Sequence, residues 1–174
     1  IRKIHAEFKQ PVLIEEMVGT REVNVSVFQR GVTVKVLPPA EIDFSALSSD
    51  LPPIVGYTAQ WKEDSEAYIN TPRIIPARLT PSELRTVKAV ARKAWLALGC
   101  RDYARVDMRL TEDGTPYVLE VNANPDISLA AGFAAALEVE GIPYEQFVAG
   151  IVRNARKRLR SASVRSPHQP APPK

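Results

Sequence analysis

The sequence predicts an α+β fold in which a mostly antiparallel sheet is flanked by helices. Two pairs of segments alternate between apolar and polar residues, 21–28 with 32–37 and 103–110 with 116–122, and a short turn joins each pair. Segments with helical spacing lie before and after the second pair, and hairpins combined with helices are typical of the fold class. The length of 174 residues and the apolar content of 45% suit one globular domain with its own core.

The first part of the chain contains three predicted strands. Pro11–Glu16 has the pattern of a short buried strand that ends in two acids. Arg21–Phe28 alternates, with three valines on one face and polar residues on the other. Arg30-Gly31 then turns the chain into Val32–Leu37, and the prolines at 38 and 39 end that strand.

Residues 40–79 have little periodicity and contain prolines at 52, 53, 72 and 76. A structureless segment of this length is uncommon in a compact domain and often serves as a lid over a site. The alternative is a long loop that is docked on the domain by Tyr57 and Trp61.

Three helices are predicted after this loop. The first begins with Thr80 as its N-cap and Glu83 as its capping-box partner, and Gly99 ends it. Its apolar stripe consists of Leu84, Val87, Val90, Ala91, Ala94, Trp95 and Leu98. The second is expected to start at the cap residue Ser128 and to run to Glu140. The third covers Pro143 to about Leu159, with Phe147, Ile151 and Val152 facing inward.

Charge is distributed unevenly along the chain. Seven of the 23 basic residues lie from Arg153 onward, where no acid is found, so residues 1–152 carry 16 basic and 20 acidic residues. The end of the chain is rich in Ser and Pro, which predicts an ordered domain over residues 1–160 and a disordered basic tail over 161–174. The tail lacks interleaved aromatic residues, so a nucleic-acid partner is not favoured.

Other features narrow the class of protein. No apolar run approaches the roughly 20 residues that a membrane span needs, so no membrane partner is expected. Cys100 is the only cysteine, which excludes an internal disulfide and fits a reducing compartment such as the cytoplasm. The sequence does not indicate an oligomeric state.

The most informative stretch is the hairpin Tyr103–Pro125. If Asp113-Gly114 forms a two-residue turn, Asp107 lies opposite Glu120 and Arg105 lies opposite Asn122, all on one face. The other face, which includes Tyr117, Leu119 and Val121, is then expected to be buried. Two carboxylates opposite each other are destabilising unless they are compensated. A hard divalent cation is one compensation, and ion pairs with Arg105 and Arg109 on a solvated face are the alternative.

Four motifs in order, LIEEMVGTREV, ALGC, ARVDMRL and YVLEVNANP, resemble the C-terminal half of ATP-grasp ligases, closest to D-alanine–D-alanine ligase and its relatives. The resemblance covers about Val12 to Val152. It implies an ATP-grasp C-terminal subdomain, and it implies that Asp107, Glu120 and Asn122 hold two Mg²⁺ ions, or Mn²⁺, on the phosphates of ATP. It also implies that Arg105 steadies the transferring phosphate.

The resemblance implies a nucleoside site upstream. Glu15 would accept the adenine amino group, the linker Glu16, Met17 and Val18 would offer backbone groups, and Glu22 would bind the ribose hydroxyls. The implied reaction is ATP-dependent joining of a carboxylate and an amine of small amino-acid-like substrates through an acyl phosphate, as in the synthesis of peptidoglycan precursors.

Three departures from the family pattern qualify these expectations. Gln60 stands where the family has a loop lysine, and Lys62 is the nearest substitute. The serine expected to bind the second substrate's carboxylate falls at about Ala131, so Ser128 is the candidate for that role. The family's N-terminal half has no counterpart here, which predicts weak or no ligation by this chain. A non-catalytic ATP-grasp-like binding or scaffold module is the alternative function.

Overall fold

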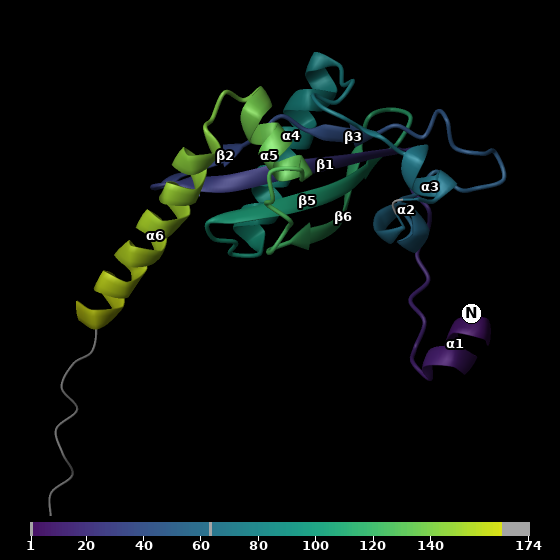
Figure 1. The fold of residues 1–174 in the computed structure, drawn as a ribbon, viewed down its shortest axis with the longest axis horizontal. Coiled ribbons are helices and arrows are strands. Elements are labelled where there is room, and N and C mark those ends of the chain that lie inside the picture. The colour runs from purple at the N-terminus through teal and green to yellow at the C-terminus, as the bar shows by residue number, and fades with distance from the viewer. Residues whose placement is uncertain (1, 63, 165–174) are drawn as a thin grey trace, which may run out of the picture.

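The computed structural model describes residues 2–62 and 64–164, which form an antiparallel sheet with helices on both of its faces (Figure 1). The strands are β1 (Arg21–Arg30), β2 (Thr33–Val36), β3 (Ala40–Ile42), β4 (Arg73–Ile74), β5 (Tyr103–Leu110) and β6 (Pro116–Asn122). The helices are α1 (Arg2–Phe8), α2 (Tyr57–Trp61), α3 (Glu66–Ile69), α4 (Pro81–Ala97), α5 (Gly132–Val139) and α6 (Tyr144–Val164).

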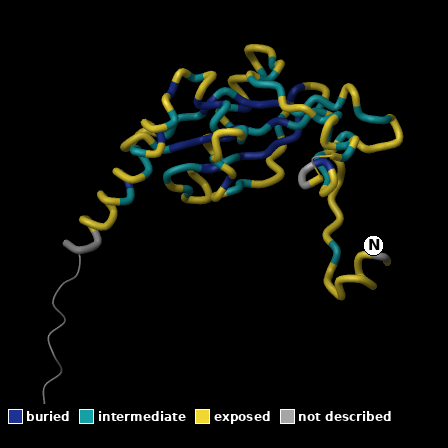
Figure 2. The backbone as a smooth tube through the Cα atoms, in the orientation of Figure 1, coloured by how far each residue is buried: buried dark blue, intermediate teal, exposed yellow. Residues whose placement is uncertain are grey.

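The sheet has the order β4-β3-β1-β5-β6, and β2 pairs with the far end of β1. Each of these pairings is antiparallel, so the predicted α+β fold class is confirmed. Strands β1 and β5 lie at the centre, where both of their edges are bonded, and Figure 2 shows them as the most deeply buried part of the backbone. Functional residues on these two strands are therefore held on a rigid platform.

One face of the sheet packs on α4. This helix forms because Thr80 accepts a hydrogen bond from the N–H of Glu83 and the Glu83 carboxylate accepts one from the N–H of Thr80, the predicted capping box. Val87, Ala91 and Trp95 of its apolar stripe are buried, as predicted. The core between α4 and the sheet is completed by Val23, Val25, Val27, Ala104, Val106, Met108 and Leu110.

Helices α5 and α6 cover one end of the opposite face of the sheet. There α5 and α6 bury an aromatic cluster in which Phe147 meets Phe28 edge to face, with ring centroids 5.5 Å apart. Tyr103 packs in the same way on Phe133 at 6.0 Å. Beyond this cluster, the same face of β1 and β5 carries polar side chains.

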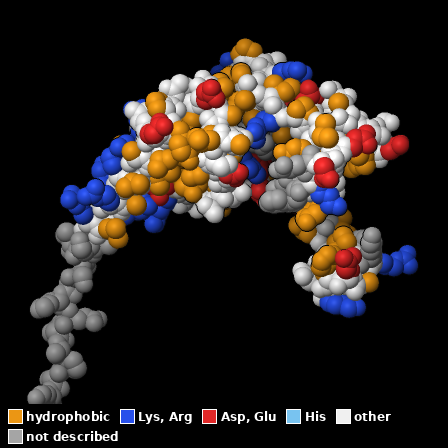
Figure 3. All heavy atoms as spheres, viewed as in Figure 1, with side chains coloured by type: hydrophobic (Ala, Val, Ile, Leu, Met, Phe, Trp, Pro, Cys, Tyr) orange, Lys and Arg blue, Asp and Glu red, His pale blue; other side chains and the backbone are white. Residues whose placement is uncertain are grey.

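Helix α6 differs from its prediction in length and orientation. It continues to Val164, so residues 161–164 are helical, and the rest of the predicted tail, 165–174, lies outside the described residues. Phe147 is buried as predicted, whereas Val152 is 52% exposed and the inward assignment was wrong. The reason is helical spacing: Phe147, Ile151 and Asn154 form the inward face, and Val152 lies outside it. Farther along, α6 extends past the edge of the sheet, and Figure 3 shows basic side chains along this extension. No helix within the described ranges is long and apolar enough to span a membrane.

The predicted buried strand Pro11–Glu16 is wrong. This segment has no regular structure, and Leu13 and Ile14 are 81% and 69% exposed. A strand needs a neighbour for its backbone hydrogen bonds, and none of the described strands pairs with this segment. It connects the fold to α1, which sequence reasoning missed and which lies apart from the sheet (Figures 1 and 2).

The prediction of an unstructured loop over residues 40–79 was wrong in part. The segment contains β3 and β4, which extend the sheet, and the short helices α2 and α3. Strands of two and three residues are too short to show a period of two, so the sequence pattern could not reveal them. Tyr57 is 73% exposed and is not an anchor, and the side chain of Trp61 is not among those described.

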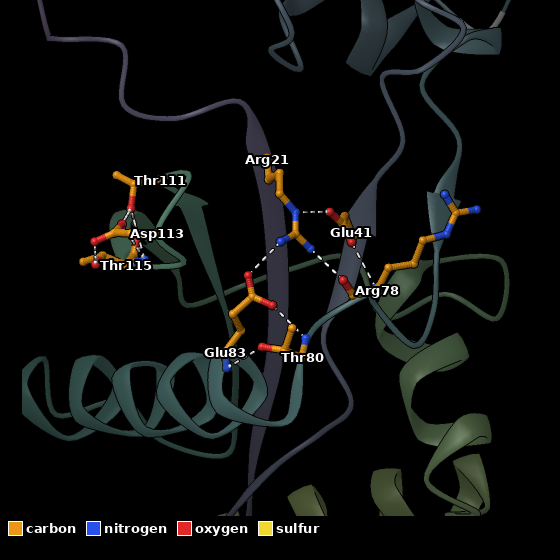
Figure 4. Close-up of polar contacts among 8 residues, drawn as sticks. All are labelled: Arg21, Glu41, Arg78, Thr80, Glu83, Thr111, Asp113 and Thr115. Atoms are coloured by element: carbon orange, nitrogen blue, oxygen red, sulfur yellow. Dashed lines mark hydrogen bonds and ion pairs between the residues drawn. The ribbon is translucent and has the colours of Figure 1, made fainter.

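A polar cluster at the start of β1 ties three elements together (Figure 4). Arg21 donates from Nε to Glu41 of β3 at 2.7 Å, from Nη1 to Glu83 of α4 at 2.9 Å, and from Nη2 to the carbonyl of Arg78 at 2.7 Å. The other oxygen of Glu41 accepts the N–H of Arg78 at 3.0 Å. One guanidinium thus fixes the strand end that precedes Glu22.

Candidate nucleotide and metal site

The hairpin of β5 and β6 brings the predicted pairs together, but its turn is not the predicted one. Leu110 lies opposite Pro116, and the N–H of Thr111 donates to the carbonyl of Thr115, so three residues rather than two form the loop. Gly114 is the third loop residue, and its φ of +80° is the left-handed conformation that such loops place on glycine. The two-residue turn was therefore wrong.

A β-bulge restores the predicted register farther along the hairpin. The pairing shifts between Asp107 and Met108, which leaves Leu119 as the extra residue of β6. Beyond the bulge Asp107 lies opposite Glu120 and Arg105 lies opposite Asn122, so both predicted pairs are confirmed.

Between the loop and the bulge, each residue of β6 lies on the side of the sheet opposite to the predicted one. Tyr117 lies opposite Arg109 on the polar face, and Tyr117 and Leu119 are exposed rather than buried. Their predicted burial was wrong because the sequence pattern showed neither the three-residue loop nor the bulge.

The centre of the polar face is an ion pair within β5. Arg105 donates from Nε to Oδ1 of Asp107 and from Nη2 to Oδ2, both at 2.7 Å. Asn24 of β1 lies opposite Asp107 and donates to the same Oδ1 at 3.0 Å. The hydrogen bond from Arg105 to Asp107 and the nearby carboxylates raise the pKa of Arg105, so this guanidinium stays charged.

The two other predicted metal ligands line the edge strand. Glu120 is exposed, and the Asn122 side-chain oxygen accepts the N–H of Asn124 at 2.9 Å. Two carboxylates and an amide oxygen are the hard oxygen donors that Mg²⁺ and Mn²⁺ prefer, and the negative charge faces an arginine that can pair with a phosphate. Across the described part of the chain no group of three or more His, Cys, Asp or Glu side chains is placed to hold a metal.

A second ion pair lies farther along the same face. Arg109 is 4% exposed and contacts Oε2 of Glu22 at 3.3 Å. Burial raises the pKa of Glu22, while the Val55 N–H and the charge of Arg109 act in the opposite direction. Glu22, the predicted ribose ligand, thus lies two residues along β1 from Asn24, on the face that carries Asp107.

The predicted adenine residues are only partly assembled. Val18 is half-buried, and its carbonyl accepts a hydrogen bond from Nε of Arg109 at 2.7 Å. Glu15, Glu16 and Met17 are exposed on the irregular segment that leads to β1. Of these four predicted adenine residues, Val18 is the one that is hydrogen-bonded to a residue of the polar face.

The two remaining candidates are not brought to the polar face by any contact in the described residues. Lys62 is exposed at the end of α2. Ser128 is also exposed and is not the cap of α5, which starts at Gly132 with Ala131 as its N-cap. The prediction that Ser128 begins this helix was wrong, because residues 128–131 form a turn closed by the Ala131 N–H to Ser128 carbonyl bond.

Sequence reasoning missed two residues of the site. Asn24 was assigned only to a polar strand face, and Arg109 was considered only as a partner for acids on the hairpin. Both could have been found from β1–β5 pairing, which places Asn24 opposite Asp107 and Glu22 opposite Arg109. That pairing joins strands about 80 residues apart, and a period of two does not reveal it.

Comparison with known proteins places this geometry in a family. Residues 3–153 match the family described as D-ala D-ala ligase C-terminus. A D-alanine–D-alanine ligase of Thermotoga sp. is 31% identical over 144 residues, 83% of this chain. D-alanine–D-alanine ligase A of Mesorhizobium japonicum is 34% identical over 155 residues, 88% of this chain. The chain spans 44% and 41% of the lengths of these two relatives.

Solved structures give the same result. The D-alanine–D-alanine ligase of Bacillus anthracis superimposes with a TM-score of 0.63 at 28% identity, over 86% of this chain and 44% of that one. The structure of the enzyme from that organism complexed with ATP gives a TM-score of 0.62 at 25% identity, over 86% of this chain and 42% of that one. The chain therefore belongs to the D-alanine–D-alanine ligase family, with the ATP-grasp fold, and corresponds to its C-terminal part.

Proposed function

We propose that this chain is the nucleotide- and metal-binding C-terminal part of an ATP-dependent carboxylate–amine ligase that forms an amide through an acyl phosphate. The observation that carries the proposal is the arrangement of Arg105, Asp107, Glu120 and Asn122 on facing residues of β5 and β6. One cation-binding edge and one phosphate-binding arginine lie side by side there, as phosphoryl transfer to a carboxylate requires.

The donor set suits Mg²⁺, with Mn²⁺ as a substitute. Asp107, Glu120 and Asn122 would hold the ion or ions, and a bound Mg²⁺ supplies neutralisation of charge on the phosphates. Arg105 is bound at two points by Asp107. Its planar guanidinium can bind a phosphate at two points, so the same side chain would orient the transferring group.

The proposed nucleoside end lies toward Glu22. Its carboxylate would accept the ribose hydroxyls, and Glu15 and the linker Glu16–Val18 would meet the adenine. Small amino-acid-like substrates, with Ser128 and Lys62 as candidate contacts, remain part of this proposal for a cytoplasmic ligase. Because the chain spans less than half of its relatives, we propose that efficient ligation needs sequence beyond these residues.

The binding part of the proposal can be tested on the 174-residue chain. ¹⁵N-labelled protein titrated with Mg·ATP should show chemical-shift changes concentrated at β5, β6 and the start of β1. Asp107→Asn should weaken Mg·ATP binding at least tenfold, because a ligand charge is lost. Asp50→Asn, at an exposed carboxylate away from the sheet, is the matched control and should bind as the wild type does. Equal affinities of the wild type and Asp107→Asn would refute the metal site.

The ligation part needs a longer form of the protein. Amino-acid-dependent phosphate release should fall at least a hundredfold in Arg105→Met, because the transferring phosphate loses its guanidinium. Unchanged turnover in that variant would reject the assigned reaction and would favour a binding module instead.

A further inference from the structure

Arg109 is a buried cation that donates four hydrogen bonds to protein groups. Nε donates to the Val18 carbonyl at 2.7 Å and Nη2 to the Gly19 carbonyl at 2.9 Å. Nη1 donates to the Pro53 carbonyl at 3.0 Å and to Glu22 at 3.3 Å. A buried arginine is costly unless its donors are satisfied, and here three separate segments satisfy them.

The first of these segments is pressed against β5. Gly19 has a φ of +55°, and a Cβ built on it would lie 1.9 Å from the carbonyl oxygen of Leu110. Only glycine permits this approach. The irregular linker is therefore fixed at 18–19 by Arg109 and by direct backbone contact, although Leu13 and Ile14 just before it are exposed.

The second segment is residues 53–55, and the third is the start of β1, which carries Glu22. Its carboxylate faces Arg109 at 3.3 Å, and the nearby backbone N–H of Val55 acts to lower its pKa. Arg109 also donates to the Pro53 carbonyl, so residues 53–55 are attached to the pair through this bond. Without Arg109 the largely buried Glu22 carboxylate would lose its ion partner.

We propose that Arg109 is the positioning residue for the nucleoside end of the site: it holds the linker carbonyls of Val18 and Gly19 and the Glu22 carboxylate in the arrangement that distinguishes a nucleotide from a bare polyphosphate. This inference rests on the proposed function. Arg109 acts through these groups rather than by touching phosphate, because four of its five N–H donors are used by the protein.

Spacing along β5 separates this role from that of Arg105. Four residues of a strand span about 13 Å, so the two guanidinium groups start from well-separated points of the same face. Arg105 stands beside the carboxylates proposed to hold the cation, and Arg109 stands beside the linker. Loss of Arg109 should therefore reduce recognition of the nucleoside and leave recognition of the phosphates intact.

The test compares two ligands that differ only in the nucleoside, Mg·ATP and Mg·tripolyphosphate. Calorimetric or NMR titration of Arg109→Met should give an ATP affinity about tenfold lower than that of the wild type, and a tripolyphosphate affinity within about twofold of it. Arg85→Met, which removes an exposed arginine from α4, is the matched control and should change neither. Arg109→Lys keeps the charge but lacks the planar fork, so a smaller loss for ATP alone is expected.

Amide hydrogen exchange gives a second readout without ligand. The Val55 and Gly19 amides should exchange faster in Arg109→Met, while those of β5 and α4 should not. Equal loss of both ligands, or unchanged ATP affinity with unchanged exchange, would overturn the inference and leave the proposed function standing. A wild-type chain that binds neither ligand would overturn the proposed function and this inference together.

Discussion

Arg105 and Asp107, separated by one residue on β5, bind each other at two points of 2.7 Å. Each side chain thus satisfies the other. A phosphate and a divalent cation would replace both partners at once, the phosphate on the arginine and the cation on the carboxylate.

Divalent cation and ATP are therefore expected to bind cooperatively. A cation alone must displace Arg105 from Asp107, whereas ATP offers the guanidinium a new partner. We expect the affinity for Mn²⁺, measured by electron paramagnetic resonance, to rise at least tenfold when ATP is present, about 1.4 kcal/mol of coupling. Arg105→Met should bind Mn²⁺ alone more tightly than the wild type does, because Asp107 is then free of its arginine partner. A weaker affinity for Mn²⁺ in this variant would contradict the idea that the cation replaces Arg105 as the partner of Asp107.

Glu22 should make stability depend on pH in the direction opposite to that of an ordinary salt-bridged acid. Burial raises its pKa above the ordinary value of 4.5, so the folded state holds this proton to a higher pH than the unfolded chain does. Its contribution is present below the unfolded pKa and is lost as the pH rises through the folded pKa.

The measurement compares the free energy of unfolding of the wild type with that of Glu22→Gln by urea denaturation. The wild-type value minus the Glu22→Gln value should decrease between about pH 4 and pH 7. A difference that increases over this range would show that Arg109 outweighs burial.

Arg21 is expected to contribute strongly to stability. Its removal leaves Glu41, which is 8% exposed, without its ion partner and breaks a link between β1, β3 and α4. Arg21→Met should lower the free energy of unfolding by about 2–3 kcal/mol. Arg85→Met should stay within about 0.5 kcal/mol of the wild type. Adding Glu41→Gln to Arg21→Met should restore part of the loss, and a fully additive double variant would argue against coupling.

Gly114 should be harder to replace than another glycine of the same conformation. An added Cβ would lie 2.8 Å from Cγ of Glu83, whose carboxylate is held by Thr80 and Arg21 and cannot move freely. Gly31 has a similar φ of +65° with open space around it. Both alanine variants lose about 1–2 kcal/mol to the left-handed backbone, and Gly114→Ala should lose about 1 kcal/mol more. Equal melting temperatures for Gly114→Ala and Gly31→Ala would show that the contact with Glu83 does not add to the cost of replacing Gly114.

The sequence was informative where a pattern is local. The capping box of Thr80 and Glu83, the stripe of α4 and the alternation of β1 and β5 each depend on neighbours within a few residues, and each is present. The facing of Asp107 and Glu120 was also predicted, although from an incorrect turn.

What the sequence could not show depends on distant partners. Pro11–Glu16 has the composition of a strand but no strand beside it, and β3 is recognisable only through its pairing with β1 and β4. The sequence pattern places Arg109 on a polar strand face but does not show that it is buried under the carbonyls of Val18, Gly19 and Pro53. Each of these features is decided by tertiary structure.

Relative to a two-residue turn at Asp113-Gly114, the three-residue loop and the bulge at Leu119 each shift the strand register by one position, in opposite directions. One residue added in the loop displaces the pairing of the hairpin by one position, and one residue left unpaired in β6 returns it. Deleting Leu119 alone would remove the bulge and leave Glu120 paired with Asp107, and deleting one loop residue would also keep this pair as long as Thr111 and Thr115 still close the loop. Length variation in the loop of this hairpin thus leaves the facing of Asp107 and Glu120 unchanged wherever the closing pair is kept.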